Sequence, residues 1–246
     1  MNTSKNNQLK MKQGALKRVI FLKFCYFSIL ILFISCKNET NKPNKLSLDS
    51  KQATEVITST KTTSKKIIFF GDSLTAGYGL DDVNDAFPGL IQQKIDSLQL
   101  KYTVINSGVS GETTAGGKNR IDWVLSTKPD IFILELGAND GLRGLPLAET
   151  EKNLQVIIDR VKSKYPDTKI ILAGMQIPPN MGPEYSTTFK NIFPNLAEKN
   201  KLALVPFLLE NVGGIAALNQ TDGIHPTAEG HSILAENVWI ILKEIL

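Results

Sequence analysis

The feature that most constrains how this chain can fold is a short apolar segment at 67–70, Ile-Ile-Phe-Phe. Turn-forming residues follow it at once, beginning with Gly71, Asp72 and Ser73. A β-branched and aromatic run that ends in turn residues predicts a fully buried strand. Since open α/β sheets bind ligands at the carboxyl ends of their strands, Ser73 stands where an exposed nucleophile could be held. An ordinary Gly/Ser turn after a strand would look the same, so this stretch alone leaves both interpretations open.

The remaining chain alternates short apolar segments with stretches in which apolar residues recur at helical spacing. Strands are predicted at 102–106, 131–136, 169–173 and 202–205, and helices at 85–98, around 121–125, and at 154–161, 185–196 and 228–246. Asp85 is expected to cap the first of these helices, with Pro88 in its first turn. Alternating strands and helices predict right-handed crossovers and a parallel sheet covered on both faces. The sequence therefore predicts one α/β domain with five parallel strands over residues 66–246.

The N-terminal 35 residues have the composition of a signal peptide. They carry six Lys or Arg and no acid, and end in an apolar stretch at 24–35. That stretch, about 12 residues long, is too short to span a bilayer comfortably and suits a signal-peptide core. Ser35-Cys36 resembles a bacterial lipoprotein processing site, which implies a lipidated Cys36 as the mature N-terminus. Phe33 departs from the Leu usual there, and a plain signal peptide or an uncleaved anchor is the alternative.

Residues 36–65 are rich in Lys, Thr, Ser and Asn and have little apolar content. Such a composition cannot bury a core and predicts a disordered tether. An acylated Cys36 with this tether would hold the domain at a membrane of the cell envelope, facing the periplasm or the surface.

Charge and cysteine usage exclude several classes of partner. The net charge of +4 comes from 28 basic and 24 acidic residues, and removing the six leader bases leaves 22 against 24, a net of −2. There is then no overall basic field to attract nucleic acid. Both cysteines, Cys25 and Cys36, lie in the leader region. The folded part therefore has no disulfide framework and no thiolate metal site.

Three polar clusters follow predicted strands, and one precedes the last helix. They begin at Ser73, at the Gly108–Gly111 loop, at Asn139 and at Thr221, and parallel strands would bring the first three to one edge. A serine nucleophile needs a base within reach, and that base needs an orienting group. Asp222 lies three residues before His225, so one turn can join the carboxylate to the imidazole. Taken singly, Asp222 could be a turn former and His225 a loop histidine.

Three other polar residues have structural interpretations. His231 falls in the last helix and is expected to pack against the core. Asn139 alone could be a helix cap. Glu135 stands inside an apolar strand, where a carboxyl group needs partners, and a structural hydrogen-bond network is its expected role.

Taken together, four segments resemble the four blocks of the SGNH hydrolases, also called GDSL lipases and esterases. They are Gly71-Asp-Ser-Leu74, the loop at Gly111, Gly137-Ala-Asn-Asp140 and Asp222-Gly-Ile-His225. The resemblance runs from about Ile67 to the C-terminus. It implies that Ser73 is the nucleophile, His225 the general base and Asp222 its orienting group.

The same resemblance implies an oxyanion hole made by the backbone N–H groups of Ser73 and Gly111 and the side-chain amide of Asn139. Asp72 and Asp140 would be structural supports. Gly108 competes for the glycine position, but the flanking Asn-Ser-Gly-Val-Ser-Gly-Glu-Thr sequence resembles the family pattern in the register that selects Gly111.

Within the family, the segments after Ser73, around Glu135 and at Asp222 resemble one branch. It comprises the secreted multifunctional arylesterases, lysophospholipases and acyl-CoA thioesterases. That branch implies a flavodoxin-like three-layer α/β/α fold and a groove for acyl esters or thioesters, with no metal or organic cofactor. The groove would be lined by the 141–146 and 176–182 loops, with acyl contacts from Leu142, Leu145, Ile177 and Met181.

The expected partners are therefore a small acyl ester or lipid substrate and, through the lipid anchor, a membrane. A carbohydrate acetyl esterase is one alternative function. The other is a surface lipoprotein that uses the same fold to bind a ligand without catalysis.

Overall fold

The computed structural model describes residues 64–246. The predicted signal peptide, the lipidation site at Cys36 and all but the last two residues of the predicted tether lie outside these residues. Within 64–246, no helix combines the length and the apolar character that crossing a bilayer requires.

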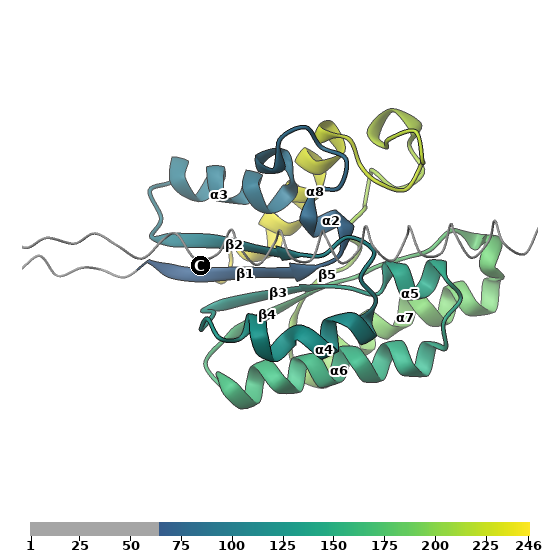
Figure 1. Ribbon diagram of the computed structural model, residues 1–246, viewed down its shortest axis with the longest axis horizontal. Coiled ribbons are helices and arrows are strands. Elements are labelled where there is room, and N and C mark those ends of the chain that lie inside the picture. The colour runs from purple at the N-terminus through teal and green to yellow at the C-terminus, as the bar shows by residue number, and fades with distance from the viewer. Residues whose placement is uncertain (1–63) are drawn as a thin grey trace, which may run out of the picture. The chain divides into compact units, whose positions relative to one another are not determined.

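The sheet has five parallel strands in the order β2-β1-β3-β4-β5 (Figure 1). Their bounds are β1 Lys65–Gly71, β2 Tyr102–Gly108, β3 Ile131–Glu135, β4 Lys169–Ala173 and β5 Ala203–Val205. The predicted α/β class and the flavodoxin-like strand order are thereby confirmed. Because every strand points the same way, all five carboxyl ends lie along one edge, where ligands bind in this class of sheet.

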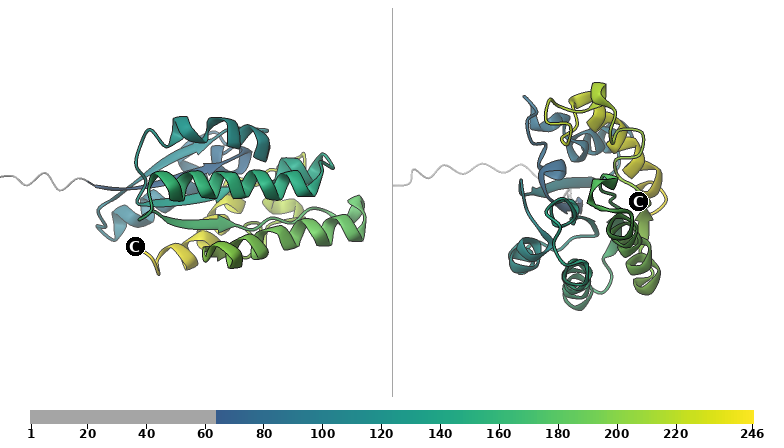
Figure 2. Two further views of the ribbon diagram at one scale, coloured as in Figure 1. Left: turned by 90° about the horizontal axis from the view of Figure 1, so that it is seen from below. Right: turned by 90° about the vertical axis from the view of Figure 1, so that its right-hand side faces the viewer.

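Helices cover both faces of the sheet, as Figures 1 and 2 show. One face carries α2 (Ser73–Ala76), α3 (Phe87–Ser97) and α8 (Ala228–Leu242), and the other carries α4 (Thr114–Val124), α5 (Ala138–Leu142), α6 (Leu147–Lys164) and α7 (Pro183–Asn200). Three 3-10 turns lie at η1 Val83–Asp85, η2 Pro179–Met181 and η3 Ala216–Leu218. The three layers bury two apolar interfaces.

Burial along the strands explains their sequences. The apolar residues of β1 and all of β3 are buried, because these central strands are covered on both faces and need no polar alternation. The edge strand β2 is only partly buried, and the other edge, β5, is three residues long. Short edge strands limit unwanted pairing with other chains.

Several helix ends differ from the sequence prediction, since α6 and α7 extend beyond their predicted apolar stretches, and the ends of α3 and α8 are the most informative. α3 begins at Phe87 rather than Asp85, and its cap Ala86 makes no side-chain capping bond. Asp85 instead belongs to η1, which Asp82 caps by accepting from the Asn84 N–H at 2.8 Å. The predicted cap at Asp85 is therefore wrong, because a 3-10 turn comes first. At the other end, α8 stops at Leu242, four residues earlier than predicted.

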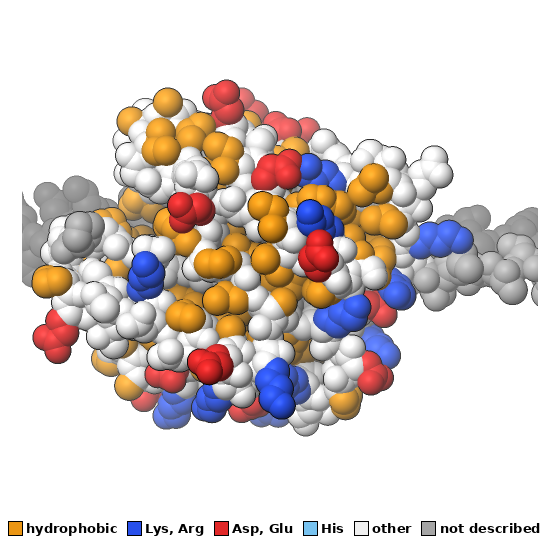
Figure 3. All heavy atoms as spheres, turned by 180° about the vertical axis from the view of Figure 1, so that it is seen from behind, with side chains coloured by type: hydrophobic (Ala, Val, Ile, Leu, Met, Phe, Trp, Pro, Cys, Tyr) orange, Lys and Arg blue, Asp and Glu red, His pale blue; other side chains and the backbone are white. Residues whose placement is uncertain are grey.

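The face opposite to the viewer of Figure 1 mixes charges of both signs with apolar side chains (Figure 3). Lys and Arg there lie among Asp and Glu, so this face carries no continuous basic surface of the kind that binds nucleic acid.

Candidate active site

Ser73 is the first residue of α2, at the point where β1 ends. Asp72 caps this short helix, accepting from the Leu74 N–H at 3.0 Å. The turn is possible because residue 71 is glycine. A Cβ there would lie 2.3 Å from Glu135 Oε2 and 2.6 Å from the Glu135 carbonyl oxygen. The close approach of β1 to β3 therefore fixes where the Ser73 hydroxyl emerges.

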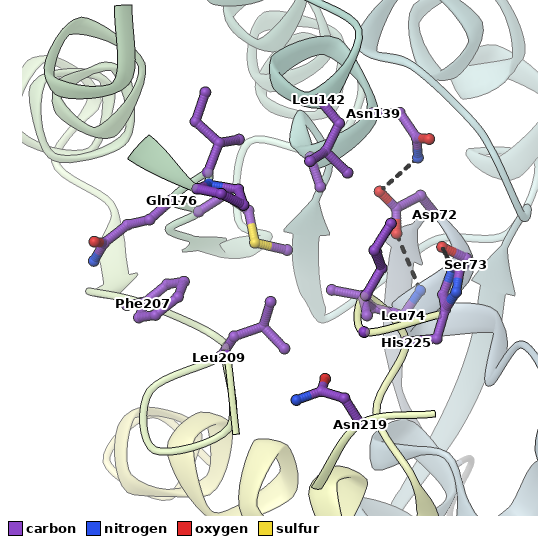
Figure 4. Close-up of a pocket in the computed structure, with 18 residues that line it drawn as sticks. Asp72, Ser73, Leu74, Asn139, Leu142, Gln176, Phe207, Leu209, Asn219 and His225 are labelled. Carbon is purple, nitrogen blue, oxygen red and sulfur yellow. Dashed lines mark hydrogen bonds between the residues drawn. The ribbon is translucent and has the colours of Figure 1, made fainter. Parts of the chain in front are cut away.

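His225 connects Ser73 to a carboxylate. Its Nε2 lies 3.0 Å from Ser73 Oγ (Figure 4), and its Nδ1 lies 2.6 Å from Asp222 Oδ2. The other oxygen of Asp222 accepts from the backbone N–H groups of Ile224 at 2.9 Å and His225 at 3.0 Å. The His225 ring bond, followed by these backbone bonds, lowers the pKa of Asp222 to about 2. The structure thus joins the three residues proposed from the sequence in one continuous relay.

Gln220 connects two segments by hydrogen bonds. One is the turn that contains His225, and the other is the segment that follows α2. The Nε2 of Gln220 donates to the Tyr78 carbonyl at 2.7 Å and to the Pro226 carbonyl at 3.0 Å, and its backbone N–H donates to the His225 carbonyl at 2.7 Å. The Tyr78 ring also packs beside the imidazole, with centroids 4.6 Å apart. The sequence gives no local signal for this role of Gln220, because its contacts join segments that are far apart in the chain.

Asn139 lies beside the Ser73 turn, and the N–H groups of Gly108 and Gly111 differ in whether they are already hydrogen-bonded. Asn139, in the first turn of α5, donates from Nδ2 to Asp72 Oδ2 at 3.1 Å, which brings its amide next to the Ser73 turn. The N–H of Gly108 is already used, since it donates to Asn106 Oδ1 at 3.0 Å. The N–H of Gly111 has no partner among the described residues. This difference favours Gly111 over Gly108 as a donor to a ligand.

Two buried carboxyl groups lie beneath the serine. Glu135 Oε2 accepts from the Asp72 N–H at 3.1 Å and from the Thr75 hydroxyl at 2.7 Å, which is the hydrogen-bond network expected for this residue. Burial, and then the neighbouring charge of Asp72, raises the pKa of Glu135 well above its usual value. Burial also raises the pKa of Asp72 to about 6, although the Leu74 N–H and the Asn139 amide oppose that rise. Together these bonds hold the residues on both sides of Ser73.

Asp140 and His231 have structural surroundings. Asp140 accepts from the Thr114 N–H at 2.8 Å and from the Thr150 hydroxyl at 3.3 Å, which ties α5 to α4 and α6. His231 is buried in α8, stacks on the Phe87 ring at 6.2 Å, and accepts from the Phe87 N–H at 3.3 Å. Both arrangements agree with the supporting and packing roles expected from the sequence.

A mostly apolar pocket of about 450 Å³ opens beside Ser73 (Figure 4). Leu142 and Ile177 line it, whereas Leu145 and Met181, which were also expected to contact substrate, are not among its lining residues. Phe207 and Leu209, from the segment after β5, form a further wall that was not expected from the sequence. The sequence offers only a short apolar run at 205–209, and nothing in this run indicates which of its side chains would face the pocket. Within 64–246, no group of three or more His, Cys, Asp or Glu side chains could hold a metal ion.

Comparisons with known proteins identify the family of this chain. The model of the GDSL-like lipase/acylhydrolase family matches residues 69–233. The chain is 38% identical over 192 residues to esterase TesA of Pseudomonas aeruginosa, covering 78% of this chain and 94% of the relative. It is 37% identical over 176 residues to an arylesterase of Vibrio mimicus, covering 71% and 86% of the two chains.

A third relative is the thioesterase 1/protease 1/lysophospholipase L1 of Escherichia coli K12. It is 34% identical over 171 residues, which cover 69% of this chain and 79% of the relative. Among solved structures, the crystal structure of TesA superposes with a TM-score of 0.71 at 39% identity, covering 74% of this chain and all of that one.

Proposed function

This chain belongs to the GDSL-like lipase/acylhydrolase family and is a carboxylic ester hydrolase, and on that premise we propose that Ser73, His225 and Asp222 are its catalytic triad. The observation that carries the proposal is the relay from Asp222 through His225 to Ser73, with contacts of 2.6 and 3.0 Å. A hydroxyl in contact with an imidazole whose other nitrogen meets a carboxylate has the arrangement of an activated nucleophile.

The proposed reaction proceeds in two steps. Ser73 Oγ attacks the acyl carbonyl carbon while His225 Nε2 takes the hydroxyl proton. The tetrahedral intermediate then expels the alcohol or thiol, which receives that proton from His225, and leaves an acyl group on Ser73. A water molecule attacks the acyl-enzyme in the same way and releases the acid and the free serine. Throughout, Asp222 holds the Nδ1 proton of His225 and stabilises the imidazolium.

In the proposed site, the negative charge on the carbonyl oxygen meets three donors: the backbone N–H groups of Ser73 and Gly111 and the amide of Asn139. Donors fixed before the reaction stabilise this charge without reorganising, and are commonly the largest electrostatic contribution to such reactions. The unpartnered N–H of Gly111 and the position of Asn139 against Asp72 support these assignments.

Covalent labelling tests the nucleophile directly. A fluorophosphonate probe should label the purified protein, and Ser73→Ala should abolish both labelling and hydrolysis of p-nitrophenyl esters. Ser126→Ala, in an exposed turn after α4, is the matched control and should keep both. If Ser73→Ala still turns over substrate at the normal rate, the serine mechanism proposed here is wrong.

For substrates, we propose aryl esters, lysophospholipids and acyl thioesters whose acyl chain lies in the pocket beside Ser73. Support comes from the largely apolar walls, to which Leu142, Ile177 and Leu209 contribute, and from the names of the relatives. Each methylene moved from water into such a pocket contributes about 0.8 kcal/mol at most. The value of kcat/KM should therefore rise from p-nitrophenyl acetate to the octanoate. A preference for acetate would instead favour the carbohydrate acetyl esterase.

We further propose that the protein is a lipoprotein of the cell envelope, anchored through Cys36. The basis is the sequence alone: a basic, acid-free leader with a short apolar core that ends at Ser35-Cys36. Fractionation of expressing cells tests it. The wild type should remain with membranes and incorporate labelled fatty acid, and Cys36→Ser should lose the label. Incorporation of no label by the wild type would exclude lipidation.

A further inference from the structure

Arg143 connects two segments of the proposed oxyanion hole that are 28 positions apart in the chain. It follows α5 directly and is exposed to solvent. Its Nη2 donates to Asn139 Oδ1 at 3.2 Å and to the Gly111 carbonyl at 3.0 Å. One nitrogen of the Arg143 guanidinium therefore donates one hydrogen to Gly111 and the other to Asn139. These are the two residues other than Ser73 that would donate to the oxyanion.

The side-chain amide of Asn139 is held from both ends. Arg143 donates to its oxygen, and its nitrogen donates to Asp72 Oδ2 at 3.1 Å. An amide turned by 180° would face its oxygen toward the Asp72 carboxylate and its NH₂ toward the guanidinium, so both contacts would become repulsive. The cation and the anion therefore specify the same orientation. In that orientation the second hydrogen of Nδ2 is left for a ligand.

Nothing else in the described structure accounts for where Arg143 lies. Among residues 64–246, it makes no ion pair with a carboxylate, and its only side-chain hydrogen bonds are those to Gly111 and Asn139. Its exposure means that removing it opens no cavity in the core. A side chain placed this way can change the site with little effect on folding.

We propose that Arg143 is a positioning residue, which aligns the Asn139 amide and the Gly111 loop as oxyanion donors. The inference rests on the proposed function, because it assumes that these two groups contact the developing negative charge. Arg143 itself need not touch substrate. Its contribution lies in fixing donor geometry before the reaction, which is when such alignment is effective.

A double-mutant cycle tests this role in the full-length protein at pH 8, with a p-nitrophenyl ester as substrate. Outright loss of one oxyanion donor costs about 10² to 10³ in kcat, whereas Arg143→Ala leaves the donors present but less well held. We therefore expect Arg143→Ala to lower kcat about tenfold in the wild-type background, with KM little changed. In the Asn139→Ala background, where the amide is already gone, the further loss should be smaller.

Arg160→Ala is the matched control, because Arg160 is an exposed arginine on α6, remote in sequence from every proposed site residue. It should leave kcat unchanged, and neither arginine variant should change the urea unfolding midpoint. The proposal is overturned if Arg143→Ala leaves kcat unchanged in the wild-type background, or costs as much in the Asn139→Ala background. A raised KM with normal kcat would also overturn it, by making Arg143 a substrate-binding residue.

Rejection of the role of Arg143 can be distinguished from failure of the proposed catalytic triad. If Ser73→Ala remains active, the triad is wrong and the cycle has no premise. If hydrolysis depends on Ser73 and the two substitutions are nevertheless additive, the triad stands and the role of Arg143 is rejected.

Discussion

Two aspartates of this site show how far surroundings decide the behaviour of one residue type. Asp222 is exposed and accepts three hydrogen bonds, which lower its pKa to about 2. Asp72 is buried beside Glu135, and burial raises its pKa to about 6. Asp222 therefore stays ionised throughout the neutral range, as a carboxylate must if it is to orient His225 and stabilise its charged form. Asp72 serves the turn and the Asn139 amide instead.

Substitution of Asn139 tests the contribution of a single side chain to the proposed oxyanion hole. Asn139→Ala should lower kcat by about 10² to 10³, because one of the three proposed oxyanion donors is lost. The half-buried side chain contributes little to the core, but its loss leaves the buried Asp72 Oδ2 without its partner, so the free energy of unfolding should fall by about 1 to 3 kcal/mol. Steady-state kinetics and urea unfolding of the same preparation measure both quantities. A kcat within twofold of the wild type would exclude Asn139 from the oxyanion hole.

At the scale of elements, the decisive unit is the turn from β1 into α2. Gly71 lies opposite Glu135 in the register of β1 and β3, and no room remains between them for a side chain. Gly108, at the end of β2, meets α2 as closely: a Cβ there would lie 2.3 Å from the Ala76 backbone nitrogen. Gly71 and Gly108, at the ends of neighbouring strands, thus allow α2 to pack directly against the sheet edge, with Ser73 as its first residue.

Gly71→Ala should therefore destabilise the protein strongly. The new Cβ would lie 2.1 Å from Thr75 Oγ1 and 2.6 Å from the Glu135 carbonyl oxygen, so backbone would have to move. We expect a loss of at least about 3 kcal/mol in the free energy of unfolding. Gly213→Ala is the control, since its nearest contacts are at 3.5 Å and its φ is not positive, and it should cost less than about 1 kcal/mol. Equal unfolding midpoints for the two variants would contradict this account of the turn.

Which elements could be predicted from sequence follows from their length and burial. β4 was predicted to its exact ends, and the central strand β3 to within one residue, because buried strands are continuous apolar runs. The helices α2 and α5, of four and five residues, are too short to show any period, yet they position Ser73 and Asn139. Their places after predicted strands singled out Ser73 and Asn139, and the motif resemblance then gave them roles, where periodicity could do neither.

The parts of the site that sequence reasoning missed depend on long-range contacts. Gln220 reaches Tyr78 and Arg143 reaches Gly111 across gaps of 142 and 32 residues. Phe207 and Leu209 belong to the pocket only because the segment after β5 folds back toward Ser73. The local sequence cannot predict such contacts, because it does not indicate which distant segments of the chain lie nearby in the fold.

At the scale of the whole molecule, buried titratable groups make stability depend on pH in two opposite senses. Glu135 and Asp72 have raised pKa values in the folded state, so their protonated forms are favoured and stability declines as pH rises above their usual values. His231 has the reverse effect. Burial lowers its pKa from 6.5 to about 4, so the folded state favours the neutral ring and stability declines as pH falls below 6.5.

The contribution of His231 can be isolated by substitution. Between pH 7.5 and 4.5 the wild type should lose about 2 to 3 kcal/mol through this residue, because a tenfold change in an ionisation constant corresponds to about 1.4 kcal/mol. His231→Gln has no group that titrates in this range, and its amide oxygen can still accept from the Phe87 N–H. The free energy of unfolding is therefore to be measured in urea at pH 7.5 and pH 4.5 for both proteins. The decrease between these pH values should be about 2 to 3 kcal/mol smaller for His231→Gln than for the wild type. Because Asp72 and Glu135 titrate alike in both proteins, their effects cancel in the difference. Parallel curves for the two proteins would mean that His231 is not held neutral by its burial against α3.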